Sequence, residues 1–369
     1  MLGHCSWKRN RRSILLLSQT ASVCCFLFIL INAFRNNKKL KTTTERNEIT
    51  HYEKVTFRKN STESESPICT GNLLSGREYN YAKWARGSYD NRLESTTGSC
   101  RLLYYTAERI VSCLDSFRDH NHFNLPHQYL KNITKTQQNN LHFAFIGDSR
   151  IRQQFLNFVK LIPDYDKKSQ PSPIPFMHHG DIEITSNILK LRVSFQWRPV
   201  INVTVTETIR RWTISGPNDE RPDFILLSMA LHHIIHINSV EDYKRLYQEK
   251  VIEFAPILDQ LGKVSQVIWL NQHPTMDLKK PTSEMVHKYN KDNRHIFENH
   301  HNIHIWDSSI PLVEEYIRSC FILERKNSES FWEALDYSTP YINCYDNVHP
   351  GYLVLSQATQ LLYNNIFNN

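Results

Sequence analysis

Glycine is scarce in this sequence, and no internal repeat is present. Only 10 of the 369 residues are glycine and 15 are proline, which excludes collagen-like and low-complexity classes. Hydrophobic residues make up 40% and charged residues 22%, a composition typical of a folded globular protein. The mean hydropathy of −0.50 excludes a protein with many membrane spans but leaves room for one.

A strong excess of one charge is also absent. Lysine and arginine number 44 against 37 acidic residues, so the net charge is +7. The basic residues cluster near the N-terminus, and the sequence therefore does not indicate a nucleic-acid partner. The composition remains compatible with anionic small-molecule ligands.

One long stretch near the N-terminus lacks charge altogether. No charged residue lies between Arg12 and Arg35, and a transmembrane helix needs about 20 apolar residues. The hydrophobic core of a cleaved signal peptide is shorter, and residues 31–34 do not resemble a cleavage site. The sequence therefore predicts a transmembrane signal anchor at 13–34, preceded by a cytosolic tail at 1–12. Basic residues flank the span on both sides, so they do not decide its orientation.

Glycosylation triplets favour a lumenal position for everything after the anchor. Asn60, Asn132 and Asn202 each begin an Asn-x-Ser/Thr triplet, and all three follow the span. Residues 35–67 are polar and without periodicity, which predicts a flexible stalk. We expect a lumenal domain at 68–369.

Five cysteines lie beyond the anchor, enough for two disulfides and one free thiol in an oxidising compartment. They are Cys69, Cys100, Cys113, Cys320 and Cys344. Cys320 and Cys344 form a plausible pair, and the other bridge would join two of the first three and pin an irregular lobe at 68–140. Buried free thiols are the alternative. No Cys-x-x-Cys pair occurs, so a zinc ribbon is not expected.

An alternation of strands and helices begins after residue 140. Short apolar runs predict strands, longer amphipathic segments predict helices, and their alternation predicts an α/β fold with a mostly parallel sheet covered on both faces. The expected strands are 141–146, 189–197, 223–230, 266–270 and 302–306, and the expected helices are 151–161, 240–261, 284–299, 311–320 and 352–367.

The end of the first strand carries the sequence Gly147-Asp148-Ser149. Strand ends in parallel sheets commonly hold functional sites, and the N-terminus of the following helix offers N–H groups and a positive dipole to an oxyanion. Ser149 at this turn is well placed as a nucleophile. Because Asp and Ser are also preferred N-caps, a simple helix cap is the alternative.

A second motif, Asp346-Asn-Val-His349, precedes the last predicted helix. In a helical turn, side chains three residues apart share a face, so Asp346 could orient His349 as the base for Ser149. A second helix cap is again the alternative. The order and spacing of the two motifs favour a Ser149–His349–Asp346 triad.

This arrangement resembles the SGNH (GDSL-type) hydrolase superfamily. Within that superfamily, the sequence resembles most the Golgi sialic-acid O-acetyltransferases, a CAS-domain family. This narrower resemblance rests on Cys69, Cys100, Cys113, the segment 145–153 and Phe195-Gln-Trp-Arg-Pro199. The resemblance implies a three-layer SGNH/flavodoxin-like fold and a single-pass type II protein of the Golgi membrane. It also implies acetyl transfer from acetyl-CoA through Ser149 to a hydroxyl of a sialylated or nucleotide-activated sugar, without a bound cofactor.

The sequence departs from that family in two ways that concern activity. The family's full-length members continue into a multi-span domain, so a membrane partner that supplies acetyl groups is an expectation here. Many SGNH enzymes complete their oxyanion hole with a Gly and an Asn, whereas 224–230 contains no Asn and has Ser228 where the relatives have Gly. An O-acetylesterase with the same triad and an inactive binding module are the alternative functions.

Four further residues are candidates for substrate binding. Arg150 and Arg152 flank the nucleophile and would bind a carboxylate or phosphate, unless they are structural. Trp197 would line a sugar site, although core packing is the more common role for its type. His232 would reach the site from a strand end. Adjacent histidine pairs point to opposite sides of a strand, so no metal site is predicted.

Overall fold

A computed structural model describes most of the chain beyond residue 102, all within the compact unit Ser66–Asn369. The described residues are 72, 103–119, 140–175, 179–215, 221–235, 240–276, 282–326, 344, 346 and 348–367. The predicted anchor at 13–34, the stalk, Asn60 and Asn132 lie outside them. Within these ranges, no helix combines the length and the apolar character that a bilayer span requires.

The core of the fold is a seven-stranded mixed sheet with the order β2-β3-β4-β1-β5-β6-β7. Its strands are β1 (Leu141–Gly147), β2 (Lys168–Gln170), β3 (Ile182–Ser186), β4 (Leu191–Trp197), β5 (Phe224–Ser228), β6 (Gln266–Leu270) and β7 (Ile303–Trp306). The strands from β4 to β7 pair in parallel, whereas β2 and β3 are antiparallel additions at one edge. The expectation of a mostly parallel α/β sheet is confirmed.

Strand β1 is the middle strand of the sheet, and every one of its residues is buried. Alternate residues point to opposite faces, so Phe143 and Phe145 belong to one core cluster and Ala144 and Ile146 to the other. A strand that is buried on both faces reads as a continuous apolar run, which is the pattern that predicted it.

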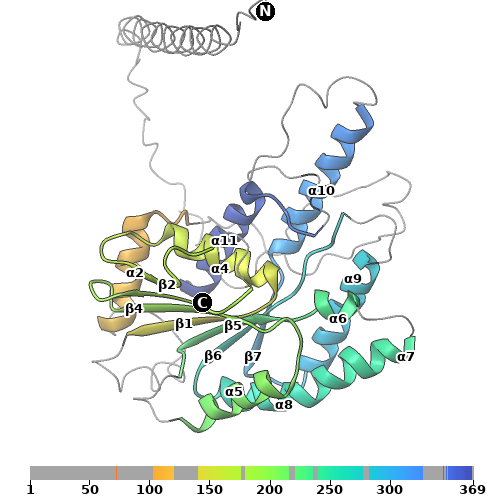
Figure 1. The fold of residues 1–369 in the computed structure, drawn as a ribbon, viewed down its shortest axis with the longest axis horizontal. Helices are drawn as coiled ribbons and strands as arrows, with labels where there is room; N and C mark the ends of the chain where they lie inside the picture. Colours follow the sequence, from red (N-terminus) through yellow and green to blue (C-terminus); the bar gives the residue numbers. More distant parts are fainter. Residues whose placement is uncertain are drawn as a thin grey trace, which may run out of the picture. The chain divides into compact units, whose positions relative to one another are not determined.

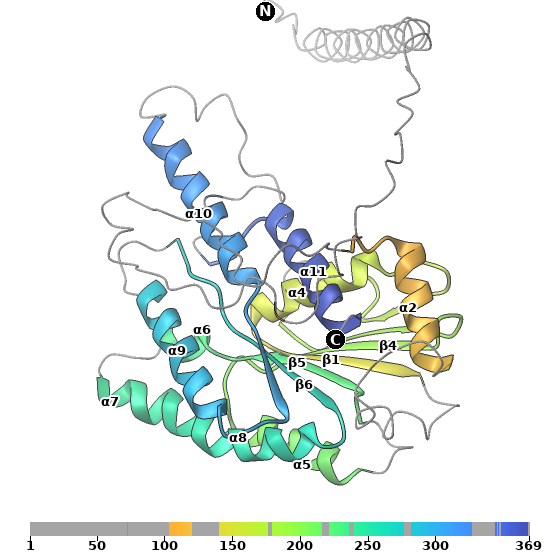
Figure 2. The same ribbon diagram turned by 180° about the vertical axis from the view of Figure 1, so that it is seen from behind.

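Helices cover both faces of the sheet (Figures 1 and 2). One face packs against α2 (Ala107–Asp119), α4 (Ser149–Leu161) and α11 (Tyr352–Phe367), and the other against α5 (Val203–Ile214), α8 (Glu249–Gly262) and α9 (Thr282–Phe297). Helix α10 (Ser309–Lys326) packs beside α11, where Val313 and Ile317 meet Val354. The first cluster places α4, which begins at the first motif, and α11, which follows the second motif, on the same face.

Several elements differ from the sequence-based expectation. Helix α2 lies inside the segment expected to be irregular, and its apolar residues Ile110, Leu114 and Phe117 pack into the core. The helix expected at 240–261 consists of α7 (Val240–Tyr243), a π-helical turn (Lys244–Gln248) and α8. The edge strands β2 and β3 were not predicted because short edge strands carry only a few alternating residues.

The turn from β1 into α4 requires glycine at position 147. A Cβ there would lie 2.3 Å from the Ser228 carbonyl oxygen and 2.5 Å from Ile151 Cγ1. Real Cβ atoms do not approach other atoms this closely, so β5 or α4 would have to shift.

We expect Gly147→Ala to lower the free energy of unfolding by about 1–3 kcal/mol because of this overpacking. Urea denaturation followed by tryptophan fluorescence measures the change. Glu207→Ala on the exposed side of α5 is the control and is expected to stay within about 0.5 kcal/mol of wild type. Equal stability of Gly147→Ala and wild type would contradict the close approach.

Candidate active site

Ser149 is the first residue of α4 and directly follows the end of β1. Asp148 is the N-cap, and its Oδ1 accepts a hydrogen bond of 3.0 Å from the Arg150 backbone N–H. Strand β1 lies between β4 and β5, which the chain reaches on opposite sides, so Ser149 lies where the direction of winding reverses. Crevices at such points bind ligands in open α/β sheets. The expected cap therefore exists, and it places Ser149 at a helix N-terminus.

The structure joins the three residues of the predicted triad. The Ser149 hydroxyl donates to His349 Nε2 at 2.7 Å, and His349 Nδ1–H donates to Asp346 Oδ2 at 3.0 Å. Because the ionised carboxylate can only accept, this pairing leaves Nε2 free to take the serine proton. Ser149 is buried, whereas the His349 and Asp346 side chains are 23% and 33% exposed.

Asp346 and His349 meet through a turn, not through the helical turn that the sequence suggested. Asp346 Oδ1 accepts hydrogen bonds of 2.9 Å from the backbone N–H groups of both Val348 and His349. Helix α11 begins only at Tyr352. Aspartate side chains commonly stabilise turns by accepting hydrogen bonds from the following backbone N–H groups. Here the turn brings the His349 ring to the second carboxylate oxygen of Asp346.

The electrostatics of the triad favour an ionised Asp346. Burial alone would raise the pKa of Asp346, but hydrogen bonds from the His349 side chain and from the two backbone N–H groups outweigh it and lower the pKa to about 2. Asp346 is therefore charged at neutral pH and can stabilise a protonated His349.

The neighbouring Asp148 behaves differently. Full burial raises the pKa of Asp148, and the charges of Arg150 and His232 together with backbone N–H groups oppose that rise. Two carboxylates on either side of the nucleophile thus have opposite environments, and only Asp346 contacts the histidine.

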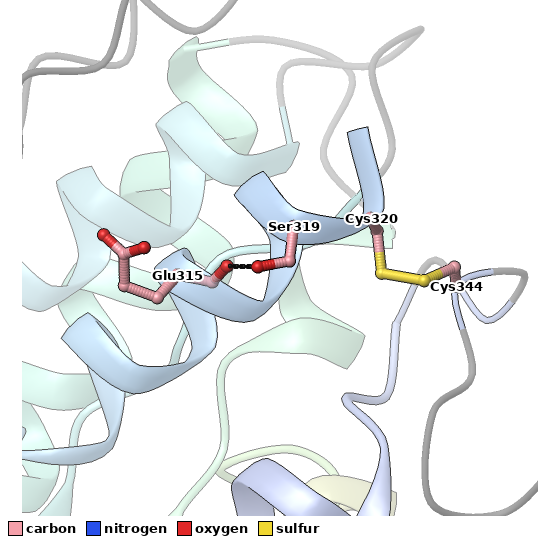
Figure 3. The surroundings of a disulfide bond; sticks show 4 residues. All are labelled: Glu315, Ser319, Cys320 and Cys344. Carbon is pink, nitrogen blue, oxygen red and sulfur yellow. Dashed lines mark hydrogen bonds between the residues drawn. A yellow bond between two sulfur atoms is a disulfide. The ribbon is translucent and has the colours of Figure 1, made fainter. Parts of the chain in front are cut away.

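A disulfide holds the segment that leads into the second motif. Cys320 near the end of α10 is bonded to Cys344, two residues before Asp346 (Figure 3). This confirms the predicted pair. Cys113 on α2 is a free thiol, and burial raises its pKa to about 11. Cys69 and Cys100 lie outside the described residues.

The remaining candidate residues take distinct positions. Arg150 is only 4% exposed and donates hydrogen bonds into the protein interior. Arg152 is buried on the same helix, and burial lowers its pKa. Trp197 ends β4, with His179 stacked at 4.6 Å between ring centroids and His232 edge-on at 5.9 Å. Trp197 pairs with Gly147 in the register of β4 and β1, so Trp197 and the adjacent His232 lie near the turn that carries Ser149.

The strand ends beside Ser149 contain polar residues, of which sequence reasoning named Ser228 but missed Gln272 and Asn290. Ser228 ends β5, and its Oγ accepts a hydrogen bond of 3.0 Å from Gln272 Nε2. Asn290 on α9 holds the Gln272 backbone through two hydrogen bonds. Asn290 Oδ1 accepts from the Gln272 N–H, and Asn290 Nδ2 donates to the Gln272 carbonyl. The polar run Asn271-Gln272-His273 directly after the apolar strand β6 was the available signal. Ser228 is thus one end of a buried network.

In the described ranges, no group of three His, Cys, Asp or Glu side chains is arranged to hold a metal ion. The arrangement of a hydroxyl, an imidazole and a carboxylate at a helix N-terminus suits acyl transfer through a serine ester.

Comparison with known proteins identifies a relative of this chain. A search of protein-family models finds no match. The N-acetylneuraminate (7)9-O-acetyltransferase of Danio rerio is 27% identical over 173 residues, which cover 45% of this chain and 21% of the relative. The chain is related to the sialate O-acetyltransferase family. The match spans about a fifth of the relative's length.

Among solved structures, a Small COPII coat GTPase SAR1 of Encephalitozoon cuniculi in complex with GDP matches at 11% identity and a TM-score of 0.25. It covers 61% of this chain and 94% of that one. A TM-score this low does not indicate a shared fold.

The low pKa of Asp346 predicts how stability changes with acid. Its folded pKa of about 2 lies below the ordinary 3.8, so its contribution is complete above about pH 5 and is lost as the pH falls toward 2. We expect the stability difference between wild type and Asp346→Asn to shrink over this range, measured by urea denaturation. In a His349→Gln background the shrinkage should be smaller, because one hydrogen bond is missing. A difference that is constant with pH would contradict the assignment.

The disulfide predicts a stability loss that a matched cysteine does not share. Cys344→Ser opens a loop with a sequence separation of 24, and we expect it to lower the free energy of unfolding by ~3 kcal/mol. Cys113→Ser, which breaks no bridge, should cost about 1 kcal/mol or less. Thermal unfolding compares the two. Alkylation of both Cys320 and Cys344 in the unreduced protein would contradict the bridge.

Proposed function

We propose that this protein is an O-acetyltransferase that moves an acetyl group from acetyl-CoA, through Ser149, to a hydroxyl of a sialic acid. The hydrogen-bonded chain from Ser149 through His349 to Asp346 carries the proposal. The relationship to a protein named as a sialate O-acetyltransferase supports the choice of acyl group and acceptor.

In the first half-reaction, Ser149 forms the acetyl ester. His349 Nε2 takes the hydroxyl proton as Oγ attacks the thioester carbonyl, and Asp346 stabilises the imidazolium that results. The first N–H groups of α4 lie beside the developing oxyanion. The C–S bond then breaks, and His349 returns its proton to the CoA thiolate as it leaves.

In the second half-reaction, the acceptor sugar takes the place of CoA. His349 removes a proton from the acceptor hydroxyl, whose oxygen attacks the acetyl carbonyl of the Ser149 ester. The ester bond to Oγ breaks, and Ser149 recovers its proton from His349. The same steps with water as acceptor make an esterase, so the identity of the acceptor separates the two activities.

The topology supports an SGNH-type, flavodoxin-like assignment for this domain. The five parallel strands lie in the order β4-β1-β5-β6-β7, which in chain order is 2-1-3-4-5, the order of flavodoxin-like sheets. The nucleophile follows the first strand and the Asp346–His349 motif precedes the last helix. Both placements are those expected of the SGNH superfamily.

We place the domain in the Golgi lumen as a single-pass type II protein anchored by residues 13–34. The uncharged stretch and the glycosylation triplets support this location. Asn202 is exposed and caps α5 through Oδ1, which accepts from the Val205 N–H and leaves the amide nitrogen for a glycan. In this location the acetyl donor would come from a membrane partner or transport process.

The test is acetyl transfer by the full chain, produced in a host with a secretory pathway. The protein is incubated with radiolabelled acetyl-CoA, with and without a nucleotide-activated sialic acid. We expect label on the sugar, and a loss of ~10³-fold or more in Ser149→Ala because the nucleophile is gone. Ser194→Ala is a matched control, since Ser194 is buried and hydrogen-bonds His142 at 2.8 Å in the interior of the sheet.

Each other outcome changes the proposal in a defined way. Label released only as acetate, and lost in Ser149→Ala, identifies an esterase. Label that moves equally well in Ser149→Ala excludes Ser149 as the nucleophile. A folded protein that moves no label in either condition overturns acetyl transfer from CoA.

A further inference from the structure

Arg150 is a buried guanidinium that joins three segments around the nucleophile. It follows Ser149 on α4 and is only 4% exposed. Its Nε–H donates to the Val348 carbonyl at 3.1 Å, and its Nη1 donates to the His273 carbonyl at 2.6 Å and to Gln272 Oε1 at 3.1 Å. The side chain thus connects the start of α4 to the end of β6 and to the Asp346–His349 turn.

The bond to Val348 is the one that reaches the catalytic base. Val348 lies between Asp346 and His349 in the chain, and its N–H donates to Asp346 Oδ1 while its carbonyl accepts from Arg150. The Val348 N–H is therefore held by the Asp346 carboxylate, and the Val348 carbonyl is held by the Arg150 guanidinium. The His349 that follows directly is held where its Nε2 meets Ser149 Oγ.

The second arm of the guanidinium is anchored in a rigid part of the fold. Gln272, which accepts from Nη1, also donates to Ser228 at the end of β5, and Asn290 of α9 holds its backbone. All three residues are buried. Movement of Arg150 would therefore have to break its contacts after β6, which Gln272 connects to β5, as well as its contact to the turn.

The charge of Arg150 also matches its surroundings. Burial lowers the pKa of Arg150 to about 10, opposed by Asp148 and Asp346, so it stays charged at neutral pH. Burial, with the charges of Arg150 and His349, lowers the pKa of the adjacent His273 well below its usual range, so that ring is neutral. Arg150 is therefore charged, and the neutral His273 ring adds no second positive charge beside it.

The donors that Arg150 uses favour one of the two roles that the sequence leaves open. Three of the five N–H donors of a guanidinium are used within the protein. Two of these bonds end on backbone carbonyls and one on the Gln272 side chain, so the group is held by the protein's own structure. These bonds support the structural role.

We infer that Arg150 is a positioning residue, which holds the Asp346–His349 turn against Ser149 by clamping the Val348 carbonyl to the ends of β5 and β6. This inference rests on the proposed function in that it assumes Ser149 to be the nucleophile. Arg150 acts on the rate through the geometry of His349 and contacts neither acyl donor nor acceptor.

The experiment compares Arg150→Met, which keeps the chain length, with Arg150→Lys, which keeps the charge but loses the planar fork. The control is Arg192→Met on β4, an arginine paired with Glu183 near the opposite end of the strand from the site. The full chain is used throughout. One readout is the rate at which a fluorophosphonate labels Ser149, and the other is hydrogen exchange of the peptide that contains residues 344–355.

We expect the labelling rate to fall ~10²-fold in Arg150→Met, because a small displacement of a catalytic group has effects of this size. Arg150→Lys should fall ~10-fold, since a point charge replaces the fork only in part. Exchange at the Val348 and His349 amides should rise in both variants and stay at the wild-type level in Arg192→Met. In acetyl transfer, kcat should fall while KM for acetyl-CoA stays unchanged.

The outcomes separate the inference from the proposed function. Faster exchange in the turn of the Arg150 variants supports the clamp even if wild type does not react with the fluorophosphonate, a result that would overturn the role of Ser149. Unchanged exchange and labelling in Arg150→Lys and Arg150→Met overturn the clamp while a reactive wild type keeps Ser149 as nucleophile. A rise in KM with constant kcat would also overturn it, because that pattern indicates a substrate contact. If Arg150→Met does not fold, Gln272→Met removes one partner of Nη1 and is expected to give the same changes at smaller size.

Discussion

The position of the nucleophile depends on the absence of a side chain at residue 147. The Ser228 carbonyl of β5 and the Ile151 side chain of α4 both occupy the space that a Cβ would need. This close approach lets a fully buried strand pass directly into a helix, with Asp148 as its cap. The register of β1 against β5, the direction of the helix dipole and the place of Ser149 are therefore fixed together.

Around that turn, charge is balanced by neighbours within the protein more than by solvent. Asp148 and Arg150 are both buried, and each affects the ionisation of the other. Asp346 is less buried, yet its hydrogen bonds keep it ionised. Burying a guanidinium costs free energy that hydrogen bonds offset, and three of the five donors of Arg150 are used on the segment after β6 and on the turn that form the site. The same bonds that compensate the buried charge also fix the geometry of the triad.

The relative explains part of this arrangement and leaves part specific to this chain. The sialate O-acetyltransferase of Danio rerio matches less than half of the chain, at low identity. In this protein the end of β5 has a serine, and its hydroxyl oxygen accepts a hydrogen bond from Gln272. The N–H groups at the start of α4 are available to stabilise an oxyanion.

The sequence by itself indicated the parallel strands, the helices between them except α5, the Ser149–His349–Asp346 set and the Cys320–Cys344 pair. Buried strands and amphipathic helices have periodicities of their own, and the motifs lie at element ends where such residues act. Tertiary structure alone decided that Asp346 and His349 meet through a side-chain-capped turn, that β2 and β3 run antiparallel, and that Arg150 points inward. These depend on contacts between residues far apart in the chain, such as Arg150 with Gln272 and Val348, and no local pattern encodes such contacts.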